Sequence, residues 1–109
     1  MTRRLERLNE QVKREISEIL RTEVRDPRVG LVTVTQARCG PDLSFARVYV
    51  RPVGGEEEDL FAGLEKATPY IRRELGKRLS VRHVPELRFE PDRALEHALH
   101  IEKLLSEVL

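Results

Sequence analysis

The sequence predicts one α+β domain whose elements follow the order helix, strand, strand, helix, helix, strand, helix. Three observations predict this class. The chain has 109 residues, the size of a single domain, and is 39% hydrophobic, which supplies material for a core. Apolar residues recur every three or four positions in its first quarter. Two short segments that follow are β-branched or alternate apolar with polar residues, as strands do. We therefore expect a single domain over residues 1–109.

The first segment, about residues 4 to 24, is predicted to be a helix with one apolar stripe. The stripe residues are spaced by three and four, which places them on one side of a helix. They are Leu5, Leu8, Val12, Ile16, Ile19 and Leu20. Asp26-Pro27 ends the helix, because a proline disfavours helical geometry in the residue before it.

Two strands and a tight turn are predicted in the next part of the chain. Residues 32–35 are β-branched throughout, and residues 46–51 alternate apolar with polar side chains. Gly40-Pro41-Asp42 lies between them and provides residues that favour a turn. The two segments are therefore predicted to form a hairpin. A third, short strand is predicted at residues 87–90.

A long helical segment is predicted from the acids at residues 56–59 to about residue 79. Acidic side chains suit the positive end of a helix dipole. The apolar positions of the segment keep to one face; they are Leu60, Leu64, Ile71, Leu75 and Leu79. Pro69 interrupts the pattern, because proline removes a helical hydrogen bond. The segment is predicted to form two helices, or one kinked helix, that meet at Ala67-Thr68-Pro69.

A last helix is predicted near the end of the chain. The carboxylate of Asp92 is expected to cap its first turn. The apolar stripe of this helix consists of Leu95, Ala98, Leu99, Ile101, Leu105 and Val108.

Charge is distributed unevenly, although the formal net charge is only +1. Residues 66–88 carry seven cations against two carboxylates, whereas residues 53–65 carry five acids and no cation. At about 100° per residue, Lys66, Tyr70, Arg73 and Lys77 share a sector of about 60° on the side away from the core. Such a face can neutralise successive phosphates, and a tyrosine can stack on an unpaired base. The block therefore predicts contact with RNA, and we assign its Arg72 and Arg82 to the same site.

A second basic stripe is predicted on the first helix, opposite Val12. Its members are Arg3, Arg7, Arg14 and Arg21. Glu10 and Glu18 interrupt this stripe and can pair with the arginines along the helix. Either stripe can instead be a solvated face that serves solubility, and this alternative is stronger for the first helix. Arg78 projects close to the apolar stripe, so its stem is expected to lie on the core.

Residues that could carry catalysis or hold a metal are few. His97 and His100 are spaced to share a metal, yet no further Cys or His lies near them in the sequence. His83 has no obvious acidic partner. The sequence therefore predicts no enzyme, no metal, no cofactor and no small-molecule substrate. The single Cys39, and apolar stretches far shorter than the roughly 20 residues of a membrane-spanning helix, favour a soluble cytoplasmic protein.

Several short motifs follow one another in a distinctive order. They are Asp26-Pro27-Arg28, Thr33-Val34-Thr35, Asp42-Leu43, Ala46-Arg47-Val48-Tyr49-Val50, Ile71-Arg72, Leu75, Arg82, Pro85-Glu86-Leu87-Arg88-Phe89 and Asp92. Together, over about residues 4 to 105, they resemble the ribosome-binding factor A family of bacteria. The resemblance implies a type II K-homology (KH) domain, with an αββααβ core and an extra C-terminal helix. In that family a helix kink at an Ala-x-Gly step replaces the Gly-x-x-Gly loop of RNA-binding KH domains. The corresponding residues here are Ala67-Thr68-Pro69, with proline in place of glycine.

The resemblance also implies a role in ribosome assembly. Family members bind the small (30S) ribosomal subunit and its 16S rRNA, assist late maturation including processing of the 5′ end of that RNA, and are linked to growth in the cold. The basic face is then expected to bind 16S rRNA, with the protein a monomer. Two alternatives remain: a dimeric regulatory module that pairs through the hairpin edge and has no RNA role, and a small enzyme that uses His83 or His97.

Overall fold

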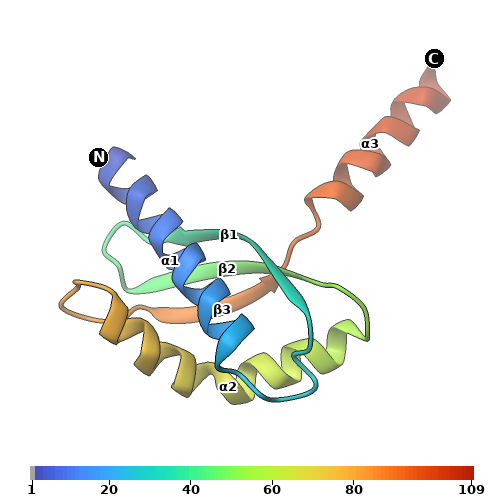
Figure 1. Ribbon diagram of the computed structural model, residues 1–109. Coiled ribbons are helices and arrows are strands. Elements are labelled where there is room, and N and C mark those ends of the chain that lie inside the picture. The colour runs from blue at the N-terminus through green and yellow to red at the C-terminus, as the bar shows by residue number, and fades with distance from the viewer. Residues whose placement is uncertain (1) are drawn as a thin grey trace.

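Three strands and three helices make up the computed structural model, which describes residues 2–109 (Figure 1). They are α1 (Thr2–Thr22), β1 (Val32–Cys39), β2 (Phe45–Pro52), α2 (Glu57–Arg78), β3 (Glu86–Pro91) and α3 (Ala94–Val108). The strands form one sheet in the order β1-β2-β3, in which β1 and β2 are antiparallel and β2 and β3 are parallel. This is the predicted α+β class, and α2 is the connection between the two parallel strands.

The core lies between one face of the sheet and the helices α1 and α2. Strand residues alternate between buried and exposed positions, so that Ala46, Val48 and Val50 of β2 point into the core. The apolar stripe of α1 packs on this face, where Val12 and Ile16 are fully buried. Burying one side chain of this size stabilises the fold by about 1.5–3 kcal/mol. The predicted stripe of α1 and the predicted alternation of β2 are confirmed.

One continuous helix, α2, occupies the segment where the sequence allows either two helices or one kinked helix. Figure 1 shows that this helix bends near its middle. Two residues account for the bend. Pro69 lacks the N–H that would bond to the carbonyl of Glu65, and Thr68 Oγ1 donates a 2.7 Å hydrogen bond to the carbonyl of Leu64. Leu64 and Ile71, on either side of the proline, are both fully buried. Because both pack into the same core, the segment forms one kinked helix, which is one of the two predicted forms.

β1 is longer than the sequence predicts, because its alternation is interrupted. Its pairing with β2 shifts between Val34 and Gln36, which marks a bulge at Thr35. The strand then continues in the shifted phase, with Ala37 and Cys39 buried. A regular alternation cannot extend across such a bulge, so the pattern read from the sequence stops at residue 35.

The predicted turn between β1 and β2 is confirmed. The Gly40 N–H donates to the carbonyl of Phe45, and the Leu43 N–H donates to the carbonyl of Gly40, both at 2.9 Å. Asp42 Oδ1 accepts from the Ser44 N–H at 3.1 Å and from the Ser44 hydroxyl at 2.8 Å. Leu43 adopts a φ of 62°, a left-handed conformation that a leucine rarely takes. The aspartate bonds hold the chain in this tight reversal.

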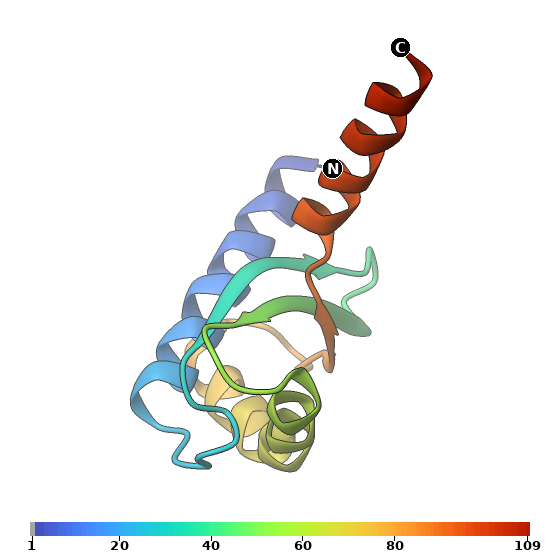
Figure 2. The ribbon, with the colours of Figure 1, turned by 90° about the vertical axis from the view of Figure 1, so that its right-hand side faces the viewer.

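α3 projects away from the rest of the molecule (Figures 1 and 2). None of its residues is buried, and Leu95 and Leu99 are more than half exposed. The helix begins one residue later than predicted: Arg93 is the N-cap residue, and Asp92 Oδ1 accepts the Ala94 N–H at 2.9 Å. Within residues 2–109, the helices lack the combination of length and apolar character that a membrane crossing needs.

Removal of residues 94–109 is expected to leave the thermal stability of the remaining domain nearly unchanged. No side chain of α3 is buried, so the deletion takes away no core contact. Surface changes alter stability by about 0.5 kcal/mol or less, which corresponds to a shift of about 2–4 °C for a domain of this size. Calorimetry of the full and shortened chains measures the shift. A fall of about 10 °C would show that α3 packs on the domain in solution.

Candidate nucleic-acid interface

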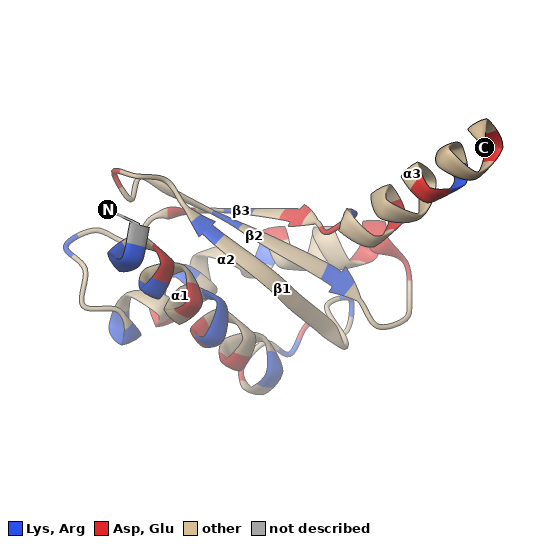
Figure 3. Cartoon of the chain, turned by 90° about the horizontal axis from the view of Figure 1, so that it is seen from above, with Lys and Arg blue, Asp and Glu red and all other residues tan. Residues whose placement is uncertain are grey.

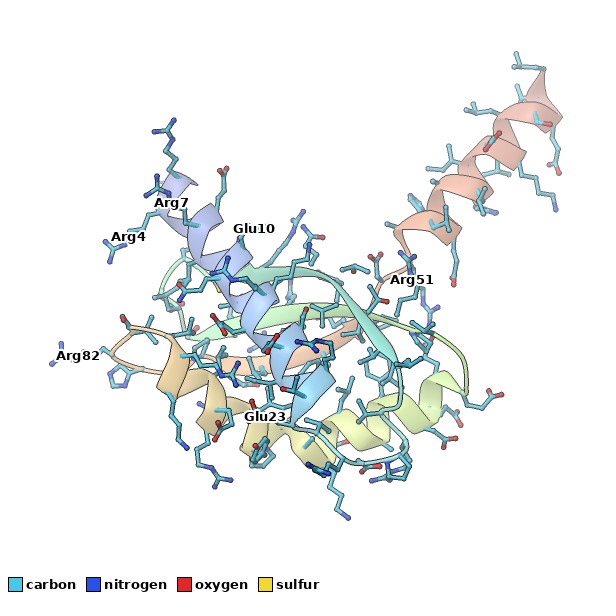
Figure 4. The ribbon with its side chains drawn as sticks, viewed as in Figure 1. Arg4, Arg7, Glu10, Glu23, Arg51 and Arg82 are labelled. Carbon is cyan, nitrogen blue, oxygen red and sulfur yellow. The ribbon has the colours of Figure 1, made fainter. Side chains whose placement is uncertain are left out.

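The predicted cations of the block 66–88 lie along one stretch of surface, from the middle of α2 to the loop that follows it. Together with the tyrosine they are Lys66, Tyr70, Arg72, Arg73, Lys77 and Arg82, a set that we call the bend face. All six are exposed except Tyr70, which is half-buried. Arg82 lies in the loop after α2 and points away from the body of the molecule (Figure 4). The helical projection is confirmed for Lys66, Arg73 and Lys77, which are exposed, but it is wrong for Tyr70, which packs against the edge of the core.

Tyr70 is held in place by contacts with both helices. Its hydroxyl donates a 2.7 Å hydrogen bond to Oε1 of Glu23, just after α1. This bond, made by the neutral phenol, raises the pKa of Tyr70 above its ordinary value. The guanidinium of Arg73 lies 5.5 Å from the centre of the tyrosine ring. The ring that is predicted to stack on a base therefore supports an arginine and has its polar tip engaged.

Glu23 joins the end of α1 to α2, because it accepts from Arg78 as well as from Tyr70. The Arg78 guanidinium contacts Oε2 of Glu23 and lies 3.4 Å from Oε1 of Glu15. The Arg78 side chain is only 27% exposed, so its stem lies against the molecule as predicted, but its head is committed to two carboxylates. Sequence reasoning misses Glu23, since its partners are 47 and 55 residues away and leave no local pattern.

Two members of the bend face already have partners in the structure. Lys77 Nζ lies 3.0 Å from Oε2 of Glu74, and this contact lowers the pKa of the Glu74 carboxyl. Arg72 donates to the carbonyls of Pro85 and Val84 at 3.1 and 2.9 Å, and so fastens the loop before β3. The remaining cations, Lys66, Arg73 and Arg82, make no ion pair with any residue in the described range 2–109. Of these three side chains, Lys66 lies close enough to the Asp26 carboxylate to help lower its pKa, so Arg73 and Arg82 carry most of the unpaired positive charge of the bend face.

A hollow of about 250 Å³ lies beside the bend, lined by residues 23–26 and by Lys66, Ala67 and Tyr70. One wall is Asp26, whose Oδ1 accepts from the Arg28 N–H at 2.9 Å and from Arg28 Nε at 3.1 Å. Oδ2 accepts from Arg28 Nη2 at 2.8 Å. These bonds lower the pKa of Asp26 to about 2. The carboxylate therefore stays ionised and holds the segment 26–28 in place next to Lys66.

Replacing Asp26 with asparagine is expected to make the free energy of unfolding fall less steeply as the pH is lowered below about 4. The pKa of Asp26 is about 2 in the folded chain against an ordinary value of 3.8, so the folded carboxylate binds a proton less tightly than the unfolded one. Its stabilising contribution is complete above about pH 4 and is lost as the pH falls toward 2. Urea midpoints of both proteins between about pH 6 and pH 2 measure this. The difference between the two urea midpoints should become smaller as the pH falls. A difference that stays constant would contradict the lowered pKa of Asp26.

The arginines of the second predicted stripe are exposed along α1. They are Arg3, Arg7, Arg14 and Arg21. Acids and cations alternate along this helix (Figure 3), and Arg21 pairs with Glu18 at 2.7 Å. Arg4, which the projection omits, is also exposed and points outward beside Arg7 (Figure 4). The charges of α1 are mixed, in contrast with those of the bend face.

The histidines considered for catalysis or metal binding lie on two different parts of the chain. His97 and His100 are exposed on α3, and His83 is exposed in the loop before β3. Within residues 2–109, no three His, Cys, Asp or Glu side chains are grouped as a metal site requires. Cys39 is buried, and burial raises the pKa of its thiol.

Known proteins with similar sequences match nearly the whole chain. The family model of ribosome-binding factor A matches residues 4–105. A ribosome-binding factor A from Natranaerobius thermophilus is 50% identical over 107 residues, which are 96% of this chain and 82% of that protein. The crystal structure of ribosome-binding factor A from Thermus thermophilus matches with a TM-score of 0.78 at 34% identity, over 83% of this chain and 97% of that one. A third match is a homology model of the Thermus thermophilus ribosome-binding factor A, fitted into a cryo-electron microscopy map of a complex of 30S with that factor. Its TM-score is 0.67 at 37% identity, over 80% of this chain and 93% of that one.

Proposed function

Because the chain belongs to the ribosome-binding factor A family, we propose that it binds the small (30S) ribosomal subunit during the assembly of that particle. The observation that carries the proposal is the set of exposed cations without an ion pair in residues 2–109, namely Lys66, Arg73 and Arg82. Cations that make no ion pair are available to RNA phosphates. The Thermus thermophilus model fitted into a map of a 30S complex supports the same partner.

The bend face binds 16S rRNA mainly through phosphates. Phosphate contacts position a protein on folded RNA by shape and carry no sequence information of their own. Arg73 is the strongest candidate, because its stacking on Tyr70 orders the guanidinium before RNA arrives. Lys77 and Arg72 contribute less, since one is paired with Glu74 and the other is bonded to loop carbonyls. The exposed arginines of α1 supply a weaker, more distant set of contacts.

The bend gives this surface its shape. The helix changes direction near Pro69 (Figure 1), and Lys66 and Arg73 lie on its two arms. The family resemblance implies that this is where RNA-binding KH domains have their Gly-x-x-Gly loop. A cationic surface with a fixed bend selects an RNA fold whose phosphates match its curvature. The protein acts by binding this fold more tightly than the alternatives, which shifts the RNA toward it without any nucleotide hydrolysis.

This action serves the late maturation of 16S rRNA, including the processing of its 5′ end. A conformation that exposes the immature end to its nuclease is the kind of state that such binding can favour. Primer extension on RNA from cells that lack the protein tests this step. Precursor 5′ ends should accumulate in those cells, and mature ends at the normal level would remove processing from the proposal.

Sedimentation of a cell extract through a density gradient tests the binding itself. The protein should migrate with free 30S subunits and leave them as the salt concentration rises. Migration at the top of the gradient as a dimer would favour the regulatory alternative. Migration at the top as a monomer, in the presence of free subunits and at low salt, would also overturn the proposal.

A further inference from the structure

The face of the sheet that α1 and α2 leave uncovered carries a row of arginines. In β2, residues 45, 47, 49 and 51 alternate with the buried residues of the strand and therefore lie on this face. Strand pairing places Arg47 opposite Arg38 of β1 and opposite Arg88 of β3. Three arginines thus cross the sheet from edge to edge. Figure 3 shows the strands from above, and α3 extends away from them.

An aromatic ring holds two of these arginines in place. The guanidinium of Arg88 lies 4.4 Å from the centre of the Phe45 ring, and that of Arg47 lies 5.4 Å from it. The ring itself rests against Gly40, where a Cβ atom would come within 2.6 Å of Phe45 Cε1. Glycine at this position allows the ring to lie flat against the backbone. The stacked guanidiniums are therefore ordered before any ligand binds, which reduces the entropy lost on binding.

The carboxylates beside Arg47 and Arg88 do not neutralise these two arginines firmly. Arg47 Nε lies 3.3 Å from Glu90 and Arg88 Nε lies 3.5 Å from Glu86, and more than 40% of each of the four side chains is exposed. Exposed pairs of this kind contribute little and exchange readily with other anions. Among residues 2–109, Arg38 has no carboxylate partner of this kind. Its Nε donates a 2.8 Å hydrogen bond to the side-chain oxygen of Gln36, which is neutral. A phosphate can replace these contacts with shorter, two-point bonds.

We propose that this uncovered sheet face, formed by Arg38, Phe45, Arg47, Tyr49 and Arg88, is a second RNA site that takes an unpaired strand. Phosphates pair with Arg38 and Arg47, and a base stacks on the Arg88 guanidinium, which lies on the Phe45 ring. The half-buried ring of Tyr49, further along β2, offers the next stacking position. Unpaired RNA is read by such aromatic and guanidinium planes, because its bases are broad rings that stack on them, whereas the carboxylates of an acidic peptide pair with the cations without stacking.

The inference rests on the proposed function, because unpaired rRNA reaches the protein when it binds an immature 30S particle. The two sites are distinct, because the bend face lies on α2 and the sheet site lies on the opposite side of the sheet from that helix. The bend face would hold folded RNA, and the sheet would hold a strand that is not yet paired. A protein with both can delay the pairing of that strand until the fold beside it is complete.

Fluorescence anisotropy with a labelled oligouridine of about 12 nucleotides, at about 50 mM salt, tests the sheet site. The variant Arg47→Ala with Arg88→Ala should bind at least about tenfold more weakly than the unaltered chain. The matched control, Arg93→Ala with Lys103→Ala, removes two exposed cations outside this face and should change binding less than about twofold. An equal loss of oligouridine affinity in the control would show that only the net charge of the protein matters, and it would overturn the proposal.

Two further variants test whether stacking on Arg88 and Phe45 contributes to oligouridine binding. Arg88→Lys retains the charge without the flat guanidinium, and Phe45→Leu retains all charges without the ring. Each should weaken oligouridine binding about threefold or more. Circular dichroism checks that the Phe45 variant is folded, because this ring covers Gly40. Unchanged binding of folded Arg88→Lys, or equal displacement of oligouridine by an acidic peptide of the same length, would overturn the site.

The bend-face variant Lys66→Ala with Arg73→Ala separates this inference from the proposed function. It should lose 30S binding and retain oligouridine binding. The unaltered chain could fail to bind 30S subunits and still bind oligouridine through Arg47 and Arg88. That result would contradict the proposed function and leave the sheet site standing. The reverse result, 30S binding without oligouridine binding, would remove the sheet site alone.

Discussion

Replacing Lys66 and Arg73 with alanine is expected to weaken binding to 30S subunits about 10- to 100-fold at about 0.1 M salt. Neither side chain has an ion-pair partner within residues 2–109, so each can neutralise one phosphate without breaking an existing contact. Two lost phosphate contacts should also lower the slope of log affinity against log salt by about 2. Co-pelleting with purified 30S subunits at four or five salt concentrations measures both the affinity and the slope.

Two comparisons sharpen this test. Arg93→Ala with Lys103→Ala removes the same charge outside the bend face and should keep most of the affinity. Lys77→Ala should have a smaller effect than Arg73→Ala, because Lys77 is already 3.0 Å from a Glu74 carboxylate oxygen. An unchanged salt slope in the Lys66 and Arg73 variant would show that this part of α2 does not contact RNA phosphates.

Replacing Leu64 with alanine is expected to lower the free energy of unfolding by about 3 kcal/mol. Leu64 is fully buried in the part of α2 before the bend, and its neighbour Gly63 is packed so closely that a Cβ there would lie 2.9 Å from Cγ2 of Val29. Tight packing around the site limits collapse into the cavity that alanine leaves. A domain of this size has a total stability of about 5–15 kcal/mol, so the loss is a large fraction of it. Urea unfolding followed by circular dichroism measures the change.

Leu99→Ala provides the matched control, because the same side chain is removed from an exposed position. Leu99 is 56% exposed on α3, against 0% for Leu64. Its removal should change the free energy of unfolding by less than about 0.5 kcal/mol. Losses of similar size in the two variants would mean that α3 is packed in solution or that Leu64 is not part of the core.

The KH-like α+β fold follows from the sequence because most of its signals are local. The stripe of α1 repeats over successive turns, and the alternation of β2 and the turn at Gly40-Pro41-Asp42 lie within a few residues of one another. The features that the sequence leaves open or misses depend on contacts between distant segments. The sequence allows two helices or one kinked helix in the α2 segment, and α2 is one helix because Leu64 and Ile71 share a core that the strands complete. The bulge at Thr35 is a property of the pairing between β1 and β2, which neither strand shows alone.

The candidate site is predictable to the level of a helix face but not to the level of individual partners. Helical projection correctly places Lys66, Arg73 and Lys77 on the exposed side of α2. It cannot show that Arg72 is bonded to loop carbonyls, because those lie 12 and 13 residues further along the chain. It also cannot show the link from Glu23 to Tyr70, which joins two helices. RNA binding by the predicted residues of both stripes stays a prediction, and the variants above test it for the bend face.

The parallel pairing of β2 with β3 has a mechanical consequence for the bend. A crossover helix is fastened to the sheet at both ends, since the strands before and after it lie side by side. A force applied to Lys66 or Arg73 is therefore transmitted to the core through Leu64 on one arm of the helix and Leu75 on the other, both of which are fully buried. The bend face is therefore fixed to the core on both sides of Pro69, and a large displacement of it requires buried contacts of α2 to break.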